Sequence, residues 1–343
     1  MRLVSPLVLV GLLVILGTLG LSSSAVAIDK MPAAKAGTIG SQTGQIAFVR
    51  DKNIWVMDAH GGHQHVVCEV GNADGRLSWS PDNKKIAFTR SGQATVQGPD
   101  NLGGKHKLYD IFVVILDSAN NSNTMWWNRL TNELGARDPE WQPDGTILFY
   151  RDLNARMVDA FLPNYQVCTM DSLGDRQEIL RKDWQNMNEY LTNPSMSPDG
   201  HIAAIHIEKP SGGSLRPRGI AILDRNHFMI SLDSIRVLSG LLENYVSPAF
   251  SPDGKWLAYY GNSMSDPSLY ISSADLKEQY LVFSPPPGTT LQSFAPSFSP
   301  DSKWLTFATR DGSIWVCDIT GNQAQRLSGP GMDASPAWSK ATK

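Results

Sequence analysis

The sequence predicts an all-β protein, a six-bladed β-propeller with four-stranded antiparallel blades, and three observations lead to it. A twelve-residue pattern recurs five times, beginning at residues 77, 139, 194, 248 and 296. A second pattern ending in Asp follows each copy, and the two ends of the chain supply complementary parts of a sixth copy. Repeats of about 40 to 60 residues are typical of propeller blades.

The composition indicates many short strands and argues against nucleic-acid binding. The 343 residues include 29 Gly, 21 Pro and 10 Trp, so turn-forming and aromatic residues are both plentiful. The formal net charge is −3, and 18% of the residues are charged, without the basic excess that nucleic-acid binding needs. A single closed all-β domain of this length is ordinary.

The first segment has the features of a secretory signal peptide. A basic start precedes the apolar run PLVLVGLLVILGTLGL, and SSSAVA after it carries the small residues that a signal peptidase recognises. We expect 1–27 to form the signal peptide with cleavage after Ala27, 28–43 to form a flexible leader, and 44–340 to form the propeller. An uncleaved membrane anchor is the alternative, although the apolar run is short for the roughly 20 residues of a membrane span.

Each twelve-residue copy predicts two strands joined by a tight turn. In PAFSPDGKWLAY, the first strand ends in an aromatic residue, SPDG forms the turn, and WLAY starts the second strand. Proline fits the second position of a type I turn because its φ is fixed, and Asp followed by Gly suits the rest. Period-two alternation places the large residues of the first strands on one face, where we expect burial. These residues are Trp79, Trp141, Met196, Phe250, Phe298 and Trp338.

The second pattern predicts a third strand, and the more polar segment after it predicts a fourth. The third strands read IFVVILD, YQVCTMD, GIAILD, LYISSAD and SIWVCD. Near the start, QIAFV and NIWVMD are a second and a third strand without a first, and SPAWS at 335–339 is a first strand without a second. Joining them completes a sixth blade and closes the ring, which removes the free sheet edges.

The repeated SPDG turn followed by an IAF-type strand resembles the repeat of TolB-type propellers, which are relatives of WD repeats. The resemblance covers residues 45–339 and is specific for the fold, because the motif recurs five times in register. It implies a channel mouth that contacts partner proteins, although such repeats serve many functions. TolB has a separate domain before its propeller, whereas about 17 residues separate the predicted cleavage site from the first strand here. We therefore expect the propeller without that domain.

The predicted binding site is the channel mouth on the face with the longer loops. In each blade, two of the turns are short and lie on one face, whereas the irregular insertions fall on the opposite face. These insertions are 91–108, 152–164, 208–218 and 261–268, and the crossings from one blade to the next at 181–193 and 284–294 lie on the same face. Residues just before each inner strand should ring this mouth and hydrogen-bond a peptide or a small ligand; a water-filled polar funnel is the alternative. The candidates are Asn72, Asp74, Arg137, Asp138, Asn193, Asn244, Tyr245, Ser293, Phe294 and Asp333.

The histidines, cysteines and repeat carboxylates favour structural functions. His60, His63 and His65 have a spacing that can hold zinc or copper, but they lie in a short turn on the other face, and we expect no metal. The three cysteines lie in strand-like runs without a Cys-x-x-Cys motif, so we expect buried small side chains, with one pair able to form in an oxidising compartment. The repeated Asp residues all occupy the same turn.

Partner binding is the function that these features predict. No nucleophile elbow, H-E-x-x-H motif or nucleotide-binding glycine loop occurs in the sequence, and we expect neither a cofactor nor catalysis. We predict an exported, monomeric binding protein, periplasmic or secreted, without a stable membrane span after signal cleavage, that holds a protein or peptide partner in the cell envelope. Two alternatives stay open: a carbohydrate-active or lyase-type propeller enzyme with a channel-lining active site, and a structural part of an envelope complex.

Overall fold

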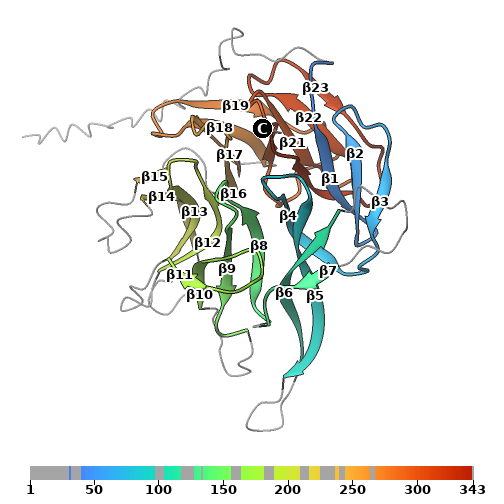
Figure 1. Cartoon of the computed structure of the whole chain (residues 1–343). Helices are drawn as coiled ribbons and strands as arrows, with labels where there is room; N and C mark the ends of the chain where they lie inside the picture. Colours follow the sequence, from blue (N-terminus) through green and yellow to red (C-terminus); the bar gives the residue numbers. More distant parts are fainter. Residues whose placement is uncertain are drawn as a thin grey trace, which may run out of the picture.

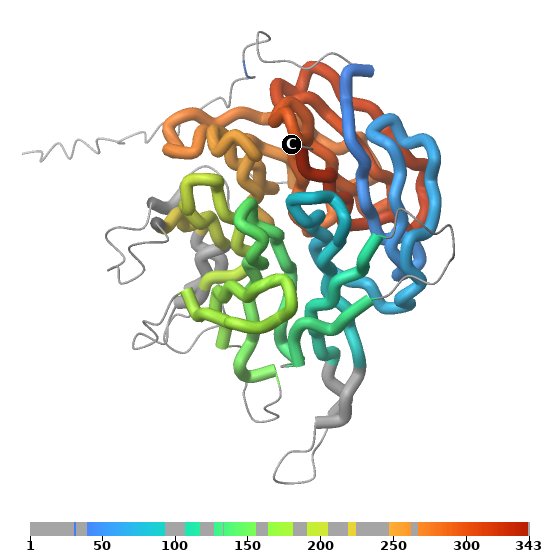
Figure 2. Tube along the Cα trace, in the orientation of Figure 1, coloured from blue at the N-terminus to red at the C-terminus, as the bar shows by residue number. Residues whose placement is uncertain are grey.

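Six four-stranded antiparallel sheets stand around a central channel, which confirms the predicted six-bladed propeller (Figures 1 and 2). In each sheet the four strands are hydrogen-bonded side by side in the order inner to outer. The structure is a computed structural model. It describes residues 31, 40–96, 104–116, 127–132, 134–155, 164–180, 189–208, 216–224, 236–238, 244–262 and 267–341.

The chain builds the blades in order around the ring. The first three blades are β24 (Ala334–Trp338), β1 (Gln45–Arg50), β2 (Asn53–Asp58) and β3 (His65–Cys68); β4 (Ala73–Trp79), β5 (Lys85–Val96), β6 (Gly104–Ile115) and β7 (Trp127–Arg129); and β8 (Ala136–Trp141), β9 (Ile147–Asp152), β10 (Tyr165–Met170) and β11 (Glu178–Ile179). The other three are β12 (Glu189–Met196), β13 (His201–Glu208), β14 (Arg216–Asp224) and β15 (Arg236–Leu238); β16 (Asn244–Phe250), β17 (Trp256–Asn262), β18 (Ser268–Ser273) and β19 (Gln279–Phe283); and β20 (Ser297–Phe298), β21 (Trp304–Ala308), β22 (Ile314–Asp318) and β23 (Ala324–Arg326).

The ring closes where the last strand joins the first blade, as predicted. The inner strand β24 pairs antiparallel with β1, with Trp338 opposite Ile46. Ser339 and Gln45 extend the pairing, because the Ser339 N–H donates to the Gln45 carbonyl at 2.8 Å and the Gln45 N–H donates to Ser339 Oγ at 3.0 Å. One blade therefore contains both ends of the propeller sequence, and no sheet edge is left between them.

The repeated Ser-Pro-Asp turns are built by their own side chains. In the turn after β16, Ser251 Oγ donates to Asp253 at 2.6 Å and accepts the Trp256 N–H at 3.0 Å. The fourth turn position is left-handed, with a φ of 71° at Gly254, so glycine suits it. The same bonds recur in the turns that begin at Ser80 and Ser299. The repeated Asp residues are turn residues, as the sequence predicted.

Large side chains of the inner strands fill the core between neighbouring blades. Of the six predicted residues, Trp79, Trp141, Met196, Phe298 and Trp338 are buried, and Phe250 is half-buried. The Trp79 indole N–H also donates to the Ala337 carbonyl of the preceding blade at 3.0 Å. The predicted register of the inner strand is therefore confirmed.

Several predicted loops are partly strands. The segment predicted as an insertion at 91–108 continues β5 to Val96 and resumes β6 at Gly104, so the two strands form a long hairpin that projects from the ring (Figure 1). The turn-forming residues GPDNLGG concentrate at 98–104, which leaves the flanking residues free to extend the ladder. In the same way, β12 begins inside the predicted crossing 181–193, and β14 begins inside the predicted insertion 208–218.

The N-terminal segment contacts the ring at a few described residues. Met31 is buried in the cluster that contains Trp256 and Phe298, and the Thr43 carbonyl accepts the Trp338 indole N–H at 2.8 Å. The predicted signal peptide, 1–27, lies outside the described residues. Among the residues that are described, no helix has the length and apolar character to cross a membrane.

The three cysteines are free and buried, at positions 68, 168 and 317. Burial raises the pKa of the Cys68 thiol to about 11, with a smaller contribution from Glu69. Cys317 lies in the core between the last two complete blades with Phe307 and Ile319. These thiols therefore serve as small apolar core residues, as predicted.

Candidate functional site

Two residues of the predicted mouth come together on the loop-rich side of the channel. Asp138 accepts a hydrogen bond from the Asn193 side-chain amide at 2.7 Å and another from the Arg76 main-chain N–H at 2.9 Å. Asp138 and Asn193 both have left-handed backbones, with φ of 51° and 50°, because each lies in a β-bulge that precedes a proline. The Asp138 carboxylate thus links three neighbouring inner strands.

Two more predicted mouth residues are held by side chains of β6. The Arg137 guanidinium lies over the Tyr109 ring, 3.3 Å from the ring centroid. Asp74 forms an ion pair with Lys107. The charges at this part of the mouth are therefore engaged by the base of the long hairpin.

Asp333 forms an ion pair inside the ring closure. Its side chain is 3% exposed, and its carboxylate accepts two hydrogen bonds from the Arg50 guanidinium, at 2.6 and 2.8 Å. The bonds to Asp333 raise the pKa of Arg50. Because the pair joins the segment before β24 to β1, Asp333 stabilises the closed blade.

The structure describes the side chains of three of the remaining predicted mouth residues. Asn72 and Phe294 are half-buried, and Ser293 is exposed. Asn244 and Tyr245 begin β16, and their side chains lie outside the described residues. The loop-side mouth as a binding site therefore stays a prediction.

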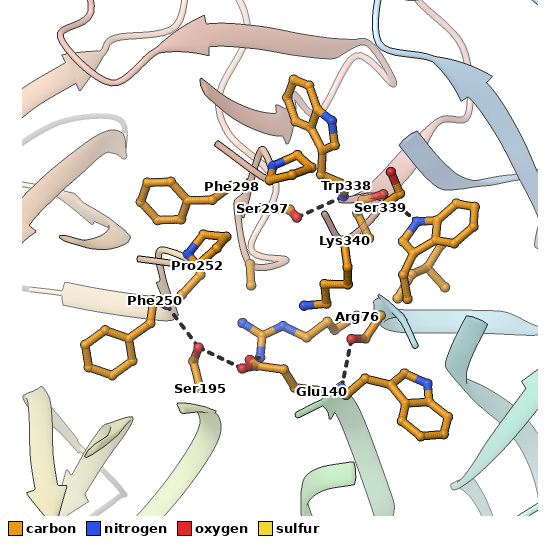
Figure 3. A pocket seen from close by; sticks show the side chains of 18 of the residues that line it. Arg76, Glu140, Ser195, Phe250, Pro252, Ser297, Phe298, Trp338, Ser339 and Lys340 are labelled. Atoms are coloured by element: carbon orange, nitrogen blue, oxygen red, sulfur yellow. Dashed lines mark hydrogen bonds and ion pairs between the residues drawn. The ribbon is translucent and has the colours of Figure 1, made fainter. Parts of the chain in front are cut away.

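A pocket of about 340 Å³ lies at the opposite end of the channel, on the face of the short turns (Figure 3). We call it the central pocket. All six inner strands contribute to it. Prolines of the repeated turns line it: Pro81, Pro143, Pro198, Pro252 and Pro300. Large residues at the ends of the inner strands also line it: Trp79, Trp141, Met196, Phe250, Phe298 and Trp338. Its volume is at the lower end of the range for ligand sites.

Arg76 forms the floor of the central pocket. In the bulge of β4, Gly75 and Arg76 have no paired residue on the neighbouring strand β5. In the bulge of β8, by comparison, two residues lie opposite one residue of β9. The Arg76 guanidinium donates to Glu140 at 2.6 Å and to the carbonyls of Pro194 and Pro248, both at 2.9 Å. Since Pro248 belongs to the blade opposite β4 in the ring, the side chain spans the channel.

Glu140 occupies a position at which three other blades have serine. Ser78, Ser195 and Ser297 each accept a main-chain N–H of the next blade. Glu140 does the same with the Met196 N–H at 3.2 Å, and it also accepts the Ser195 hydroxyl at 3.2 Å. Its longer side chain lets it hold Arg76 while it joins two blades.

Lys340 completes the charged centre. It takes the place of the turn proline in the ring-closing copy of the repeat. Asn83 fixes its backbone: the Lys340 N–H donates to Asn83 Oδ1 at 2.7 Å, and Asn83 Nδ2 donates to the Lys340 carbonyl at 2.9 Å. The side chain points toward Arg76 and Glu140 (Figure 3).

The Lys340 ammonium forms no ion pair with any described residue. Burial lowers its pKa; the Glu140 carboxylate opposes this effect, and the Arg76 guanidinium adds to it. Arg76 and Glu140 already neutralise one another. The pocket therefore contains one cation that lacks a counter-charge among the residues described.

Arg76, Glu140 and Lys340 were not among the predicted site residues. The sequence does contain a signal for each, because all three depart from the repeat. Glu140 replaces serine, Lys340 replaces proline, and Arg76 lies in an additional residue of the inner strand. A comparison of the repeat copies, position by position along the inner strands, would have identified these three residues.

The histidine cluster makes local contacts on the turn face. His63 Nδ1 lies 2.8 Å from an Asp58 carboxylate oxygen, and His65 Nδ1 lies 2.9 Å from the His63 carbonyl. The bond to His63 lowers the pKa of Asp58. Within the described ranges, no three His, Cys, Asp or Glu side chains are placed to hold a metal ion.

The fold is a six-bladed propeller, and the solved structures that it resembles include propellers of TolB proteins. The structure is similar to that of TolB from Acinetobacter baumannii, at 20% sequence identity over 87% of this chain and 67% of that chain, with a TM-score of 0.61. It is also similar to a TolB-like protein from Agrobacterium tumefaciens, at 15% identity over 84% and 90% of the two chains, with a TM-score of 0.55. A chain of the nidogen–laminin complex matches at 11% identity over 87% and 99%, with a TM-score of 0.57. No protein-family model and no curated protein matches the sequence.

Proposed function

We propose that this chain is an exported binding protein that holds a protein or peptide partner at the central pocket. The observation that carries the proposal is the Lys340 ammonium, which faces the pocket without an ion pair among the described residues. A buried or half-buried charge without a partner is costly, so such a group is typical of a site that a ligand completes.

Export and an envelope location are supported by the sequence of the first 27 residues, which has a basic start, an apolar run and a small-residue cleavage site. Protein binding is consistent with the occurrence of this fold in the nidogen–laminin complex. A closed propeller also offers a rigid scaffold on which partner contacts can be pre-organised.

The loop-side mouth is the second candidate surface for the same function. Long loops on a rigid scaffold are frequent sites of binding. Arg137 stacks on Tyr109 at this mouth, and aromatic and arginine side chains are common anchors at interfaces. The two ends of the channel can be compared directly by mutation.

The test is affinity capture from a native envelope extract, with bound proteins identified by mass spectrometry. We expect Lys340→Met to lose a partner that the unaltered protein captures. The matched control is Lys255→Met, on an exposed lysine outside the central pocket whose Nζ lies 3.8 Å from Asp253. This control should keep the partner.

The variant Arg137→Ala distinguishes the two ends of the channel. Loss of the partner with Arg137→Ala and its retention with Lys340→Met would assign binding to the loop-side mouth. Retention with both variants would contradict binding at the channel. Circular dichroism of each variant checks that the fold is kept.

A lyase-type or carbohydrate-active enzyme is the alternative function. The observation in its favour is Lys340, since a lysine with a lowered pKa in a pocket can act as a general base. The arrangement lacks a free second group, because Glu140 is held by Arg76 and Ser195. Partner binding therefore accounts better for the charged centre.

A further inference from the structure

The Arg76 side chain crosses the channel at the inner end of the central pocket. The Arg76 guanidinium reaches main-chain carbonyls of two blades on the far side, so the passage toward the loop-rich face is blocked at this level. A polypeptide that enters from the turn face has to end there or turn back. A volume of about 340 Å³ favours a single chain end over a loop, which needs room for two passes of backbone.

The charged residues of the pocket favour a ligand with one negative group. Within the part of the chain that the structure describes, three charged residues line it: Arg76, Glu140 and Lys340. Arg76 and Glu140 form an ion pair at 2.6 Å and are 10% and 15% exposed. A ligand that contacts Lys340 therefore needs one negative charge to balance the ammonium. A charge-assisted hydrogen bond to this ammonium is the strongest contact available in the pocket.

The residues that line the walls of the pocket favour a ligand with an apolar group close to its negative charge. Prolines of the repeated turns line the pocket on the face of the short turns, whereas Phe298 and Trp338 are buried in the core between the blades. Proline side chains offer apolar surface with little conformational freedom to lose on binding. The ligand is therefore amphipathic, with an apolar body and an anionic end.

We propose that the central pocket binds the free C-terminus of a peptide chain, with the terminal carboxylate on the Lys340 ammonium and an apolar last side chain against the prolines of the repeated turns. The inference rests on the proposed function and names the part of the partner that enters. Every peptide chain ends in a carboxylate next to its last side chain, so one chain end supplies both groups at the required spacing.

The experiment compares two peptide arrays that differ only at their C-termini. Both present N-acetylated peptides randomised over the last four positions; one array has free C-terminal carboxylates and the other has C-terminal amides. Binding of the full-length chain is measured by fluorescence, and selected sequences are measured again by calorimetry. We expect binding to free-acid peptides with apolar last residues, and about tenfold weaker binding or none to the matching amides.

Variants of the chain connect this binding to Lys340. Lys340→Met should lower the affinity for free-acid peptides about tenfold or more. Lys340→Arg should keep most of this affinity, and Lys255→Met should leave it unchanged. If Lys340→Met does not fold, the pH dependence of the unaltered protein replaces it. Since burial lowers the pKa of Lys340 from 10.5, affinity should fall as the pH rises toward that value, and Lys340→Arg should remove this fall. Among the described residues, Arg76 and Glu140 are the other charged groups that line the pocket, and they pair with each other.

Several outcomes would overturn the inference. Equal binding of acid and amide peptides would show that the carboxylate is not recognised. If N-acetylphenylalanine competes for the pocket as strongly as the peptides do, the pocket binds small organic acids and does not require a peptide chain. If neither array binds while Lys340→Met still abolishes capture of a protein partner, the pocket recognises a side chain or folded surface, and the proposed function stands without this inference. If neither array binds and capture is also unchanged, both fail.

Discussion

At the scale of single residues, the polar centre depends on Arg76 having several partners at once. Its guanidinium contacts Glu140 and two main-chain carbonyls from the blades of β12 and β16. Glu140 in turn bonds the blade of β12. Removing Arg76 alone leaves the Glu140 carboxylate without its ion pair and takes one hydrogen bond from each of the two carbonyls, which is more costly than removing the whole network.

We expect Arg76→Met to destabilise the protein by about 3 kcal/mol, because it leaves the Glu140 carboxylate nearly buried and unpaired. The double variant Arg76→Met with Glu140→Leu should recover part of this loss, since it removes the unpaired charge. Urea denaturation followed by tryptophan fluorescence measures both free energies of unfolding. A single variant within about 0.5 kcal/mol of the unaltered protein would show that the network contributes little to stability.

At the scale of elements, each inner strand combines a core side with a channel side. Trp141 is buried among Ile111, Phe149 and Met170, where β8 packs against its neighbours. On the same strand, Glu140 faces the channel. The two faces follow from the alternation of side chains along a strand, so one short sequence supplies both the packing and the site.

We expect Trp141→Ala to cost about 3 to 5 kcal/mol, because it opens a cavity among residues that cannot close around it. The matched control is Leu173→Ala, since Leu173 is 72% exposed in a turn of the same blade; this change should stay within about 0.5 kcal/mol. Thermal and chemical denaturation check both values. Similar effects of the two substitutions would mean that the inner strand does not have the packing described.

In the β5–β6 hairpin, the strand ends predicted from the sequence differ from those in the structure. Its strands continue to Val96 and from Gly104, although the sequence between Ser91 and Leu108 reads as irregular. Hydrogen bonding between the two arms maintains the ladder through residues with little apolar alternation. The neighbouring strand determines this pairing, so the local pattern was insufficient to predict it.

At the scale of the whole molecule, stability depends on closure of the ring. The final strand β24 is the inner strand of the blade that begins with β1, and Asp333 before it is bonded to Arg50. The core near this seam contains residues from both ends of the propeller, including Trp338 and Ile46. Loss of β24 would expose β1 and break the packing of two neighbouring blades.

We expect deletion of residues 333–343 to unfold or strongly destabilise the whole propeller cooperatively, because each blade is supported by the interfaces with its neighbours. Deletion of 341–343 alone leaves β24 intact and should keep the melting temperature. Differential scanning calorimetry and hydrogen exchange measure the loss and its extent. An unchanged melting temperature after the longer deletion would be incompatible with the observed closure.

The sequence by itself determined the architecture of this protein. Five in-register copies of the Ser-Pro-Asp turn, and the split sixth copy, were sufficient to predict six blades, the closing strand and the buried set that includes Trp79 and Trp141. These features depend on local turn chemistry and on period-two alternation, which are properties of short segments. A repeat also multiplies a weak local signal, because every copy has to satisfy the same geometry.

Only the tertiary structure decided how the channel is filled. Arg76, Glu140 and Lys340 lie far apart in the sequence and come from three different blades, and closure of the ring brings them to one pocket. The predicted mouth residues Asp138 and Asp333 are likewise engaged by partners, Asn193 and Arg50, that sequence order alone could not assign. A repeat fixes the position of each side chain within its blade, but the length and charge of that side chain determine which blade it reaches across the axis.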